Sequence, residues 1–475
     1  MKMPIFPFAL ISSVALLAGC ASDGGLTPTA RLHDGRTLPV NATLAKVPLS
    51  PSAWPTHDWW QRYGDAQLNQ LVDEALAASP TMRMAEARVR QAAAVTGVAI
   101  ALESPQLTAG ARSNRVQFSE HSTVPKPLAG SWQWSNEATL NFSYELDFWG
   151  KNRAVIDGAL DRQRAAEVDT QAARLVLTVG VTQGYLKLAQ LYAQYELAQS
   201  VLADRQQMLV LARQRVASHL DSQADLKLVE LAIPQAKAEL AAIDESIALA
   251  RNEIAALLGA GPDRGLTIAR PRLNAVRPPA VPSLLSSDLI ARRPDVVAQR
   301  WRVEAYRKDI DASKALFYPS VNLNGLIGLQ SLGFPAFLRA GSGIRSAGGA
   351  LSLPIFDGGR LRNNLAQRNA EYDLAVEAYH QTLVDAVRDV TSQLLSIQWL
   401  AERNILQAEA LATAQQAHAL SVQRYHAGLG NYLQVLASEQ QVYAQQRAQI
   451  ALDARAVDLD LQLARALGGG FLHQQ

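Results

Sequence analysis

The chain contains two copies of one pattern, and this duplication limits the possible folds more than any other feature. Pro80 and Pro294 lie 214 residues apart, as do Pro105 and Pro319. Later pairs are all 209 residues apart: Arg215/Arg424, Leu220/Leu429, Leu258/Leu467 and Gly259/Gly468. Spacings held over so many points indicate a repeated structural unit. We therefore predict two repeats, 61–282 and 283–470, each consisting of a helix, two strands and a long helical hairpin, with a short tail at 471–475.

The first residues resemble a bacterial export signal. Lys2 precedes an apolar stretch at 4–16, shorter than the roughly 20 residues of a membrane-spanning helix, and Leu-Ala-Gly then leads to Cys20, the only cysteine. This pattern resembles the lipobox, whose cysteine is lipidated and becomes the new N-terminus. We expect residues 1–19 to be a signal peptide, Cys20 to carry the lipid in the outer membrane, and 20–60 to form a linker. The alternative is an ordinary signal peptide followed by a buried thiol.

Composition and motifs argue against several functional classes. The 45 Lys and Arg nearly balance the 43 Asp and Glu without a basic run, so we expect no nucleic-acid partner. His418 and His426 are eight residues apart, not the four that place two metal ligands on one helix face. Gly150-Lys151 lacks the rest of a phosphate-binding loop. We therefore predict no enzymatic activity, no cofactor and no metal.

Four segments alternate between apolar and other residues. The alternation is unbroken from Ala138 to Phe148, clear at 321–329 and 347–355, and weaker at 106–116. About 10 alternating residues is the length of a tilted strand that crosses a bilayer, although a soluble amphipathic sheet is an alternative. Four strands cannot close a membrane barrel, and an open edge in lipid is not tolerated. The chain must therefore oligomerise, so that each protomer contributes four strands to a shared barrel.

Long helices follow the strands. Residues 150–218 and 358–427 contain no proline, which predicts helices on the order of 100 Å long, whereas 65–102 and 287–316 predict shorter ones. Two overlapping apolar seams on each long helix predict side-by-side packing. Each long helix reverses at a turn, 219–223 or 428–431. Gly428 suits a left-handed helix end; His219 at the matching position predicts a strained or differently shaped turn, and Pro234 predicts a kink.

Several motifs together resemble the TolC-type outer-membrane efflux channels, in particular their lipid-anchored NodT-like branch. The resemblance implies a homotrimer with a twelve-stranded β-barrel in outer-membrane lipid and a twelve-helix barrel through the periplasm. It also implies two partners, a periplasmic adaptor (membrane fusion) protein and an inner-membrane pump. The motifs that carry it are Trp59-Trp60, Tyr63-Gly64-Asp65, Leu68, Ala291-Arg292-Arg293-Pro294-Asp295, Phe317-Tyr318-Pro319-Ser320, the run from Pro354 to Arg360, Tyr425, Gly428-Leu429 and Tyr432-Leu433.

The resemblance also implies a functional region at the helix tips, residues 215–222 and 424–431. Asp225 and Tyr425 match an acidic residue and a tyrosine whose contact helps to hold such channels shut. Gly430, Gln434 and Ala437 stand where the family has a tip arginine and pore-lining acids, so an acidic, cation-binding constriction is not expected. The tip residues expected to contact the adaptor are Arg215, Leu220, Ser222, Arg424, Gly428 and Leu429.

Two other functions fit parts of the pattern. A periplasm-spanning structural lipoprotein would not need strands of membrane-spanning length or two-seamed helices, and a general porin would not need helices of this length. The resemblance to the TolC-type channels therefore stands, and it implies a passive outer-membrane conduit of a tripartite drug efflux pump.

Overall fold

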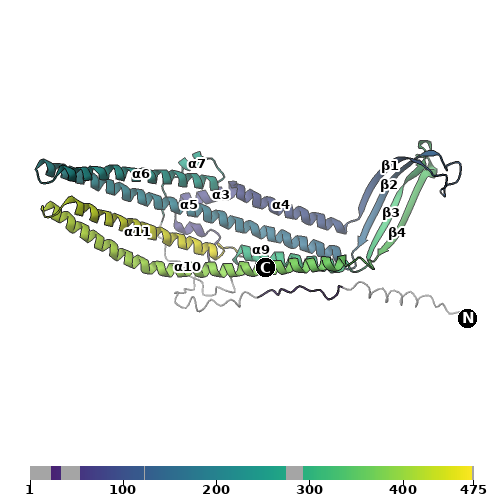
Figure 1. Cartoon of the computed structure of the whole chain (residues 1–475). Helices are drawn as coiled ribbons and strands as arrows, with labels where there is room; N and C mark the ends of the chain where they lie inside the picture. The colour runs from purple at the N-terminus through teal and green to yellow at the C-terminus, as the bar shows by residue number, and fades with distance from the viewer. Residues whose placement is uncertain (1–22, 34–53, 122, 274–291, 473–475) are drawn as a thin grey trace. The chain divides into compact units, whose positions relative to one another are not determined.

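The structure is a computed structural model that describes residues 23–33, 54–121, 123–273 and 292–472 (Figure 1). Cys20 and most of the linker predicted at 20–60 lie outside these residues. The chain divides into two compact units. The first takes Met1–Leu32, Val89–Ala166 and Gln299–His380; the second takes His33–Arg88, Glu167–Ala298 and Gln381–Gln475. Each unit therefore draws on both sequence copies.

The elements follow the predicted order twice. In the first copy they are η2 (Trp59–Tyr63), α3 (Ala66–Ala78), α4 (Pro80–Ile100), η3 (Ala101–Glu103), β1 (Gln106–Gln117), β2 (Trp132–Leu146), α5 (Lys151–Ala217), α6 (Gln223–Leu257) and α7 (Pro262–Leu266). In the second they are α9 (Pro294–Ala315), β3 (Ser320–Leu332), η4 (Phe334–Ala336), η5 (Ala340–Ser342), β4 (Gly343–Ser352), α10 (Arg360–His426) and α11 (Tyr432–Ala466).

The hairpin helices of the two copies have equal lengths. Helices α5 and α10 each contain 67 residues, and α6 and α11 each contain 35. The predicted long helices are thus confirmed to within two residues at each end. Helix α6 continues through Pro234, which lies inside it. Within the described residues, no helix combines the length and apolar character needed to cross a membrane.

The helix predicted at 65–102 is wrong in one respect, because it is interrupted. Helix α3 ends at Ala78, Ser79 is extended, and α4 begins at Pro80. Proline disfavours helical geometry in the residue before it and suits the first position of a helix. The Ser79 hydroxyl accepts a hydrogen bond from the Thr81 amide (3.2 Å), as an N-terminal cap does.

The four strands form one antiparallel sheet in the order β1-β2-β3-β4. The register pairs Leu140 of β2 with Ala109 on one side and Ile327 on the other. All four predicted strands are confirmed, but two have shifted bounds. Strand β4 runs from Gly343 to Ser352 rather than over 347–355, and β2 runs from Trp132 to Leu146 rather than from Ala138 to Phe148. Polar Asn136 interrupts the apolar alternation there and concealed this extension. It lies on the apolar face, where its Oδ1 accepts a hydrogen bond from Ser113.

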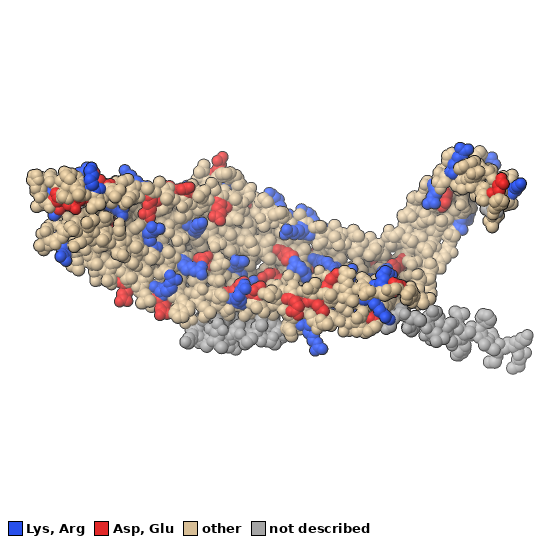
Figure 2. All heavy atoms as spheres, in the orientation of Figure 1, with Lys and Arg blue, Asp and Glu red and all other residues tan. Residues whose placement is uncertain are grey.

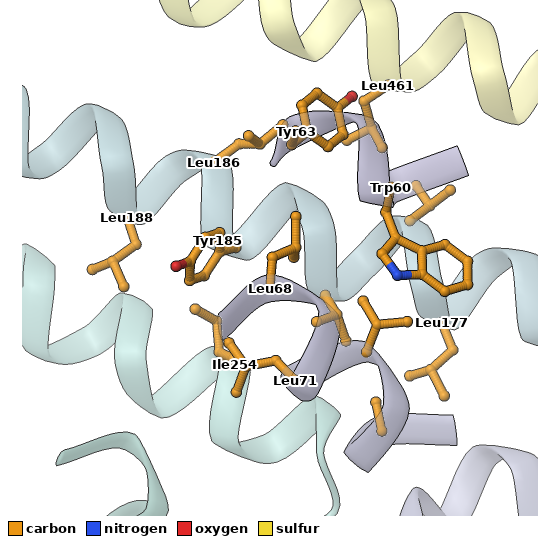
Figure 3. Close-up of a cluster of buried hydrophobic side chains, with 14 of the residues drawn as sticks. Trp60, Tyr63, Leu68, Leu71, Leu177, Tyr185, Leu186, Leu188, Ile254 and Leu461 are labelled. Carbon is orange, nitrogen blue, oxygen red and sulfur yellow. The ribbon is translucent and has the colours of Figure 1, made fainter. Parts of the chain in front are cut away.

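The core of the second unit forms around the segment that contains the Trp-Trp motif. Trp60 and Tyr63 of η2 and Leu68 of α3 pack against side chains of α5, α6 and α11 (Figure 3). Asp65 caps α3 through the Gln67 amide and accepts a hydrogen bond of 2.6 Å from the Tyr185 hydroxyl. The motif therefore attaches η2 and α3 to three long helices. The principal partners in this core are Leu177, Tyr185, Leu188, Ile254 and Leu461.

A buried carboxylate secures the same segment. The Asp460 side chain on α11 is only 1% exposed, forms an ion pair with Arg62, and accepts a hydrogen bond of 3.0 Å from the Tyr63 hydroxyl. Burial raises the pKa of Asp460, although Arg62 and Tyr63 oppose the shift. The three residues connect η2 to a helix almost 400 residues later in the chain.

In the first unit, residues near the N-terminus bind to α10. The amides of Thr29 (3.1 Å) and Ala30 (2.9 Å) and the Thr29 hydroxyl (2.7 Å) all donate to the Asp373 carboxylate. Leu26 packs against a cluster that includes Phe317 and Leu365. Desolvation tends to raise the pKa of Asp373, but the hydrogen bonds outweigh it and hold that pKa below its usual value. We call residues 23–33 the N-terminal strap.

Replacing Asp373 by Ala should release the strap. The change removes three hydrogen bonds to a charged acceptor, so the Thr29 and Ala30 amides should exchange hydrogen at least about tenfold faster, corresponding to roughly 1.4 kcal/mol. The pKa of Asp373 is lower in the folded protein than in the unfolded chain. The hydrogen bonds therefore stabilise the strap fully at a pH above the usual aspartate pKa, and this stabilisation is lost as the pH falls through the lowered pKa. Hydrogen exchange measures both effects. Glu371→Gln on the same helix is the control, and unchanged protection in Asp373→Ala would refute the attachment.

Candidate functional site

The two hairpin tips in the second unit have the same turn geometry. At the end of α5 the His219 amide donates to Val216 O and the Leu220 amide to Arg215 O. At the end of α10 the Gly428 and Leu429 amides make the equivalent bonds to Tyr425 O and Arg424 O. Both patterns are those of the Schellman motif, whose reversing residue is left-handed.

His219 adopts that left-handed conformation without being glycine. Its φ is 60°, against 74° for Gly428, and it is the one non-glycine residue with positive φ among the described residues. The expectation of strain is confirmed, because a side chain at positive φ is disfavoured. Of the two alternatives predicted, a strained or a differently shaped turn, the structure shows the strained one, since the hydrogen bonds of the second turn are reproduced.

Three polar side chains connect the two hairpins at their tips. Arg215 pairs with Asp221 across the first turn through Nε–Oδ2 (2.8 Å) and Nη2–Oδ1 (3.1 Å). The Tyr425 hydroxyl of the second hairpin donates to Asp221 Oδ2 at 2.7 Å. Arg215 Nη1 donates to Tyr425 O (3.2 Å), and its guanidinium lies 4.4 Å from the centroid of the Tyr425 ring. We call Arg215, Asp221 and Tyr425 the tip cluster.

The electrostatics of the tip cluster favour the charged pair. Hydrogen bonds from Arg215, and then from Tyr425, lower the pKa of Asp221 although partial burial opposes this. Burial and the neighbouring Asp221 carboxylate raise the pKa of Tyr425, so its hydroxyl remains a donor at neutral pH. The Arg215 and Asp221 side chains are only 13% and 12% exposed, so solvent screens the pair less than a surface ion pair.

Apolar packing supports the tip cluster. Tyr425 is 1% exposed and contacts a buried group contributed by all four hairpin helices. The rings of Tyr425 and Tyr432 lie 6.1 Å apart. This packing limits the positions open to the Tyr425 hydroxyl and thereby orients it toward Asp221. The other buried members are Ala212, Val229 and Val435.

The predicted hydrogen bond between Asp225 and Tyr425 is not formed, and this pairing is corrected. Asp225 instead completes a capping box at the start of α6: Ser222 Oγ accepts from the Asp225 amide (3.2 Å), and Asp225 Oδ2 accepts from the Ser222 amide (3.1 Å). The partner of Tyr425 is Asp221. The Ser-x-x-Asp spacing already indicates a capping box, and this signal assigns Asp225 to the helix start.

The tip residues expected to contact an adaptor differ in accessibility. Leu220 and Leu429 are 65% and 73% exposed, and Arg424 and Gly428 are also exposed. Arg215 is mostly buried in its ion pair, and Ser222 is exposed but caps α6. In the second copy Gly430 takes the place of Asp221, so Arg424 has no equivalent pair. Gln434 and Ala437 are exposed.

A second connection between the hairpins lies farther along the helices, and no motif in the sequence indicates it. Arg205 of α5 donates through Nη1 to Ala232 O of α6 (2.9 Å), and its Nε lies 3.8 Å from Glu439 Oε2 of α11. Burial raises the pKa of Glu439, and Arg205 opposes the shift. Arg447 of α11 also donates to Glu239 of α6 at 2.9 Å.

Curated relatives of the chain are named for resistance to fusaric acid or to multiple drugs. The family described as Outer membrane efflux protein matches residues 71–260 and 285–469. The fusaric acid resistance protein FusA of Burkholderia cepacia is 38% identical over 365 residues, covering 76% of this chain and 69% of that protein. The multidrug resistance outer membrane protein MdtP of Shigella flexneri is 29% identical over 475 residues, covering 98% of this chain and 96% of that protein.

Solved structures share the fold. The outer membrane protein VceC of Vibrio cholerae has a TM-score of 0.81 at 38% identity, covering 88% of this chain and 100% of that one. The CmeC outer membrane channel of Campylobacter jejuni has a TM-score of 0.85 at 20% identity, covering 95% and 96%. The predicted mainly helical fold class with a four-stranded sheet in each protomer is confirmed. The chain therefore belongs to the outer membrane efflux protein family and is an outer-membrane channel component of an efflux system.

Proposed function

We propose that three copies of the chain form a conduit that works with a periplasmic adaptor protein and an inner-membrane pump. The observation that carries the proposal is the four-stranded sheet, whose edge strands β1 and β4 have no further partner among the described residues. Unpaired strand edges in lipid are costly, and pairing β4 of one protomer with β1 of the next satisfies both. Three protomers then close a barrel of ordinary size.

Aromatic residues at both ends of the strands support a position across the bilayer. Trp149 stacks on Tyr318 with ring centroids 4.7 Å apart. The two residues lie just beyond the ends of β2 and β3 that adjoin the helices. Trp134 and Phe334 lie 5.5 Å apart at the loop ends. Trp and Tyr are enriched at the two interfaces of a membrane. The strands between these pairs therefore fit the hydrocarbon layer.

The tip cluster serves as the latch of the closed channel in this proposal. Both hairpins must separate when the narrow end widens, and the Tyr425 to Asp221 hydrogen bond connects them directly. The Arg205–Glu439 contact provides a second connection that would loosen during opening. Exposed Leu220 and Leu429 on the two turns suit contact with an adaptor, whose binding would release the latch.

Cys20 is proposed to be the lipid anchor, and the N-terminal strap holds the segment that follows it against α10. The exported compounds are proposed to be small toxic organic molecules, because relatives are named for resistance to fusaric acid and to multiple drugs. Selection among such compounds would rest with the pump, since the conduit is passive.

The trimer can be tested on protein purified in detergent. Light scattering should give a protein mass close to three times the 51.4 kDa of the chain, less the removed signal peptide. Mass spectrometry of the same sample should find a mature N-terminus at an acylated Cys20. A stable monomer would refute the shared barrel, and an unmodified N-terminus would refute only the anchor.

A further inference from the structure

The two faces of the β-sheet differ in charge. Directly paired residues of neighbouring strands point to the same face, so the register defines an apolar face that includes Leu140. On that face the described strands carry two charged side chains, Arg115 and Arg345, and no acidic one. The opposite face carries both signs, and Arg112 there pairs with Glu137. The apolar face therefore has an excess of positive charge.

Both arginines occupy matching positions at the loop end of an edge strand. Arg115 is the third residue from the end of β1, and Arg345 is the third residue of β4. Both are exposed, and neither has an acidic partner among the described residues. The guanidinium of Arg115 lies 5.7 Å from the centroid of the Trp132 ring. In Figure 2, Lys and Arg side chains lie at this end of the strands, together with acidic side chains.

The membrane position of these arginines follows from their energetic cost. An arginine on the lipid face of a strand is strongly unfavourable at the bilayer midplane and almost neutral at the interface. Trp132 beside Arg115 is typical of an interface as well. In the proposed orientation the helices extend into the periplasm, so the loop end of the sheet lies at the outer leaflet. Both guanidinium groups therefore reach the level of its headgroups.

Trimer formation brings the two kinds of arginine together. Strands β1 and β4 are the edges of the sheet, so Arg345 of one protomer and Arg115 of the next lie on neighbouring strands and on the same outward face. Like charges on adjacent strands repel each other unless an anion lies between them. A guanidinium group also matches the geometry of a phosphate.

We propose that Arg115 and Arg345 at each seam of the trimer bind the phosphate groups of lipid A, the anionic glycolipid of the outer leaflet. The inference rests on the proposed trimer and goes beyond the conduit function. Bound phosphate neutralises the repulsion at the seam, and acyl chains cover the apolar face beside it. The lipid thus becomes part of the contact between protomers.

Native mass spectrometry of the detergent-solubilised trimer, titrated with bis-phosphorylated lipid A, tests this. One arginine at a membrane surface contributes roughly fivefold in affinity. Arg115→Gln and Arg345→Gln should each bind lipid A roughly fivefold more weakly, and the double variant roughly 25-fold. Dephosphorylated lipid A should bind all of these proteins equally weakly.

The control is Arg112→Gln, on the same strand but the opposite face, which should leave affinity unchanged. If the double variant does not assemble, the lipid A affinities of the two single variants test the proposal. Equal affinity of the parent and single-variant trimers for lipid A, or no preference for the phosphorylated form, would overturn the proposal. A trimer that forms and conducts but shows no such preference refutes lipid binding alone, whereas a monomeric parent protein refutes the proposed trimer.

Discussion

Tyr425→Phe should raise the single-channel conductance of the protein in planar bilayers several-fold. The substitution keeps the ring packed beneath Arg215 but removes the hydroxyl that donates to Asp221 at 2.7 Å. A hydrogen bond to a charged group is worth roughly 1.5–3 kcal/mol, and we expect the lower end because Asp221 retains some contact with solvent. A trimer loses three such bonds, which is enough to shift a two-state equilibrium toward the open form.

Asp221→Asn should open the channel further, because it also removes the ion pair with Arg215. The folded pKa of Asp221 lies below its unfolded value. The latch therefore has its full strength at a pH above the ordinary aspartate pKa, and it is lost as the pH falls through the lowered pKa of Asp221. Conductance of the parent protein should rise over that acidic range, and conductance of Asp221→Asn should not.

Asp225→Asn is the matched control for this latch. It weakens the capping box of α6 without touching Tyr425, so conductance should remain at the parent level. If Asp225→Asn opened the channel as much as Tyr425→Phe, the latch would depend on the order of the turn rather than on the hydrogen bond. If neither change had an effect, the closed state would be held elsewhere, and Arg205 and Glu439 would be the next residues to replace.

Arg62→Ala should destabilise the protein by about 3 kcal/mol at neutral pH. Removing one partner of a buried ion pair costs roughly 3–5 kcal/mol because the other charge remains buried, and Arg62 is itself 38% exposed, which favours the lower end. The Asp460 side chain is 1% exposed, and among the described residues Arg62 is the one cation paired with it. Denaturant unfolding of the detergent-solubilised protein measures the loss.

The pH dependence separates this mechanism from a simple loss of packing. The pKa of Asp460 is raised in the folded protein. Ionisation of Asp460 therefore opposes folding increasingly as the pH rises from its pKa in the unfolded chain to its pKa in the folded protein. Below the ordinary aspartate pKa the carboxyl is neutral in both states, and the defect of Arg62→Ala should shrink. The double variant Arg62→Ala/Asp460→Asn should recover most of the stability. Lys227→Ala, at an exposed ion pair, should change nothing measurable.

A defect of Arg62→Ala that did not depend on pH, or that Asp460→Asn failed to relieve, would contradict this explanation. The loss would then come from the contact of the Arg62 guanidinium with the Tyr63 ring, whose centroid lies 5.5 Å from the guanidinium carbon.

Local periodicity was sufficient to predict the elements of this fold. The proline-free stretches predicted α5 and α10 almost to the residue, because helix length depends mainly on the local chain. Period-two alternation located the four strands for the same reason. It missed the start of β2, where polar Asn136 occupies the apolar face, and the first residues of β4, which begins at Gly343. Duplication and a glycine at one helix end predicted the paired turns. The capping box at Ser222 was also readable and would have prevented the misassignment of Asp225.

The contacts that distinguish this protein depend on tertiary structure. Asp221 and Tyr425 are 204 residues apart, Tyr63 and Asp460 are 397 apart, and Thr29 and Asp373 are 344 apart. Such pairs form only after the faces of several long helices have packed, and a shift of one residue along a helix rotates a side chain by about 100° away from its partner. The sequence by itself therefore determined the repeats, the helices, the strands and the turns. Only the packing of the helices decided which carboxylate accepts the hydrogen bond from the Tyr425 hydroxyl. The same packing decided which carboxylates bind the N-terminal segments.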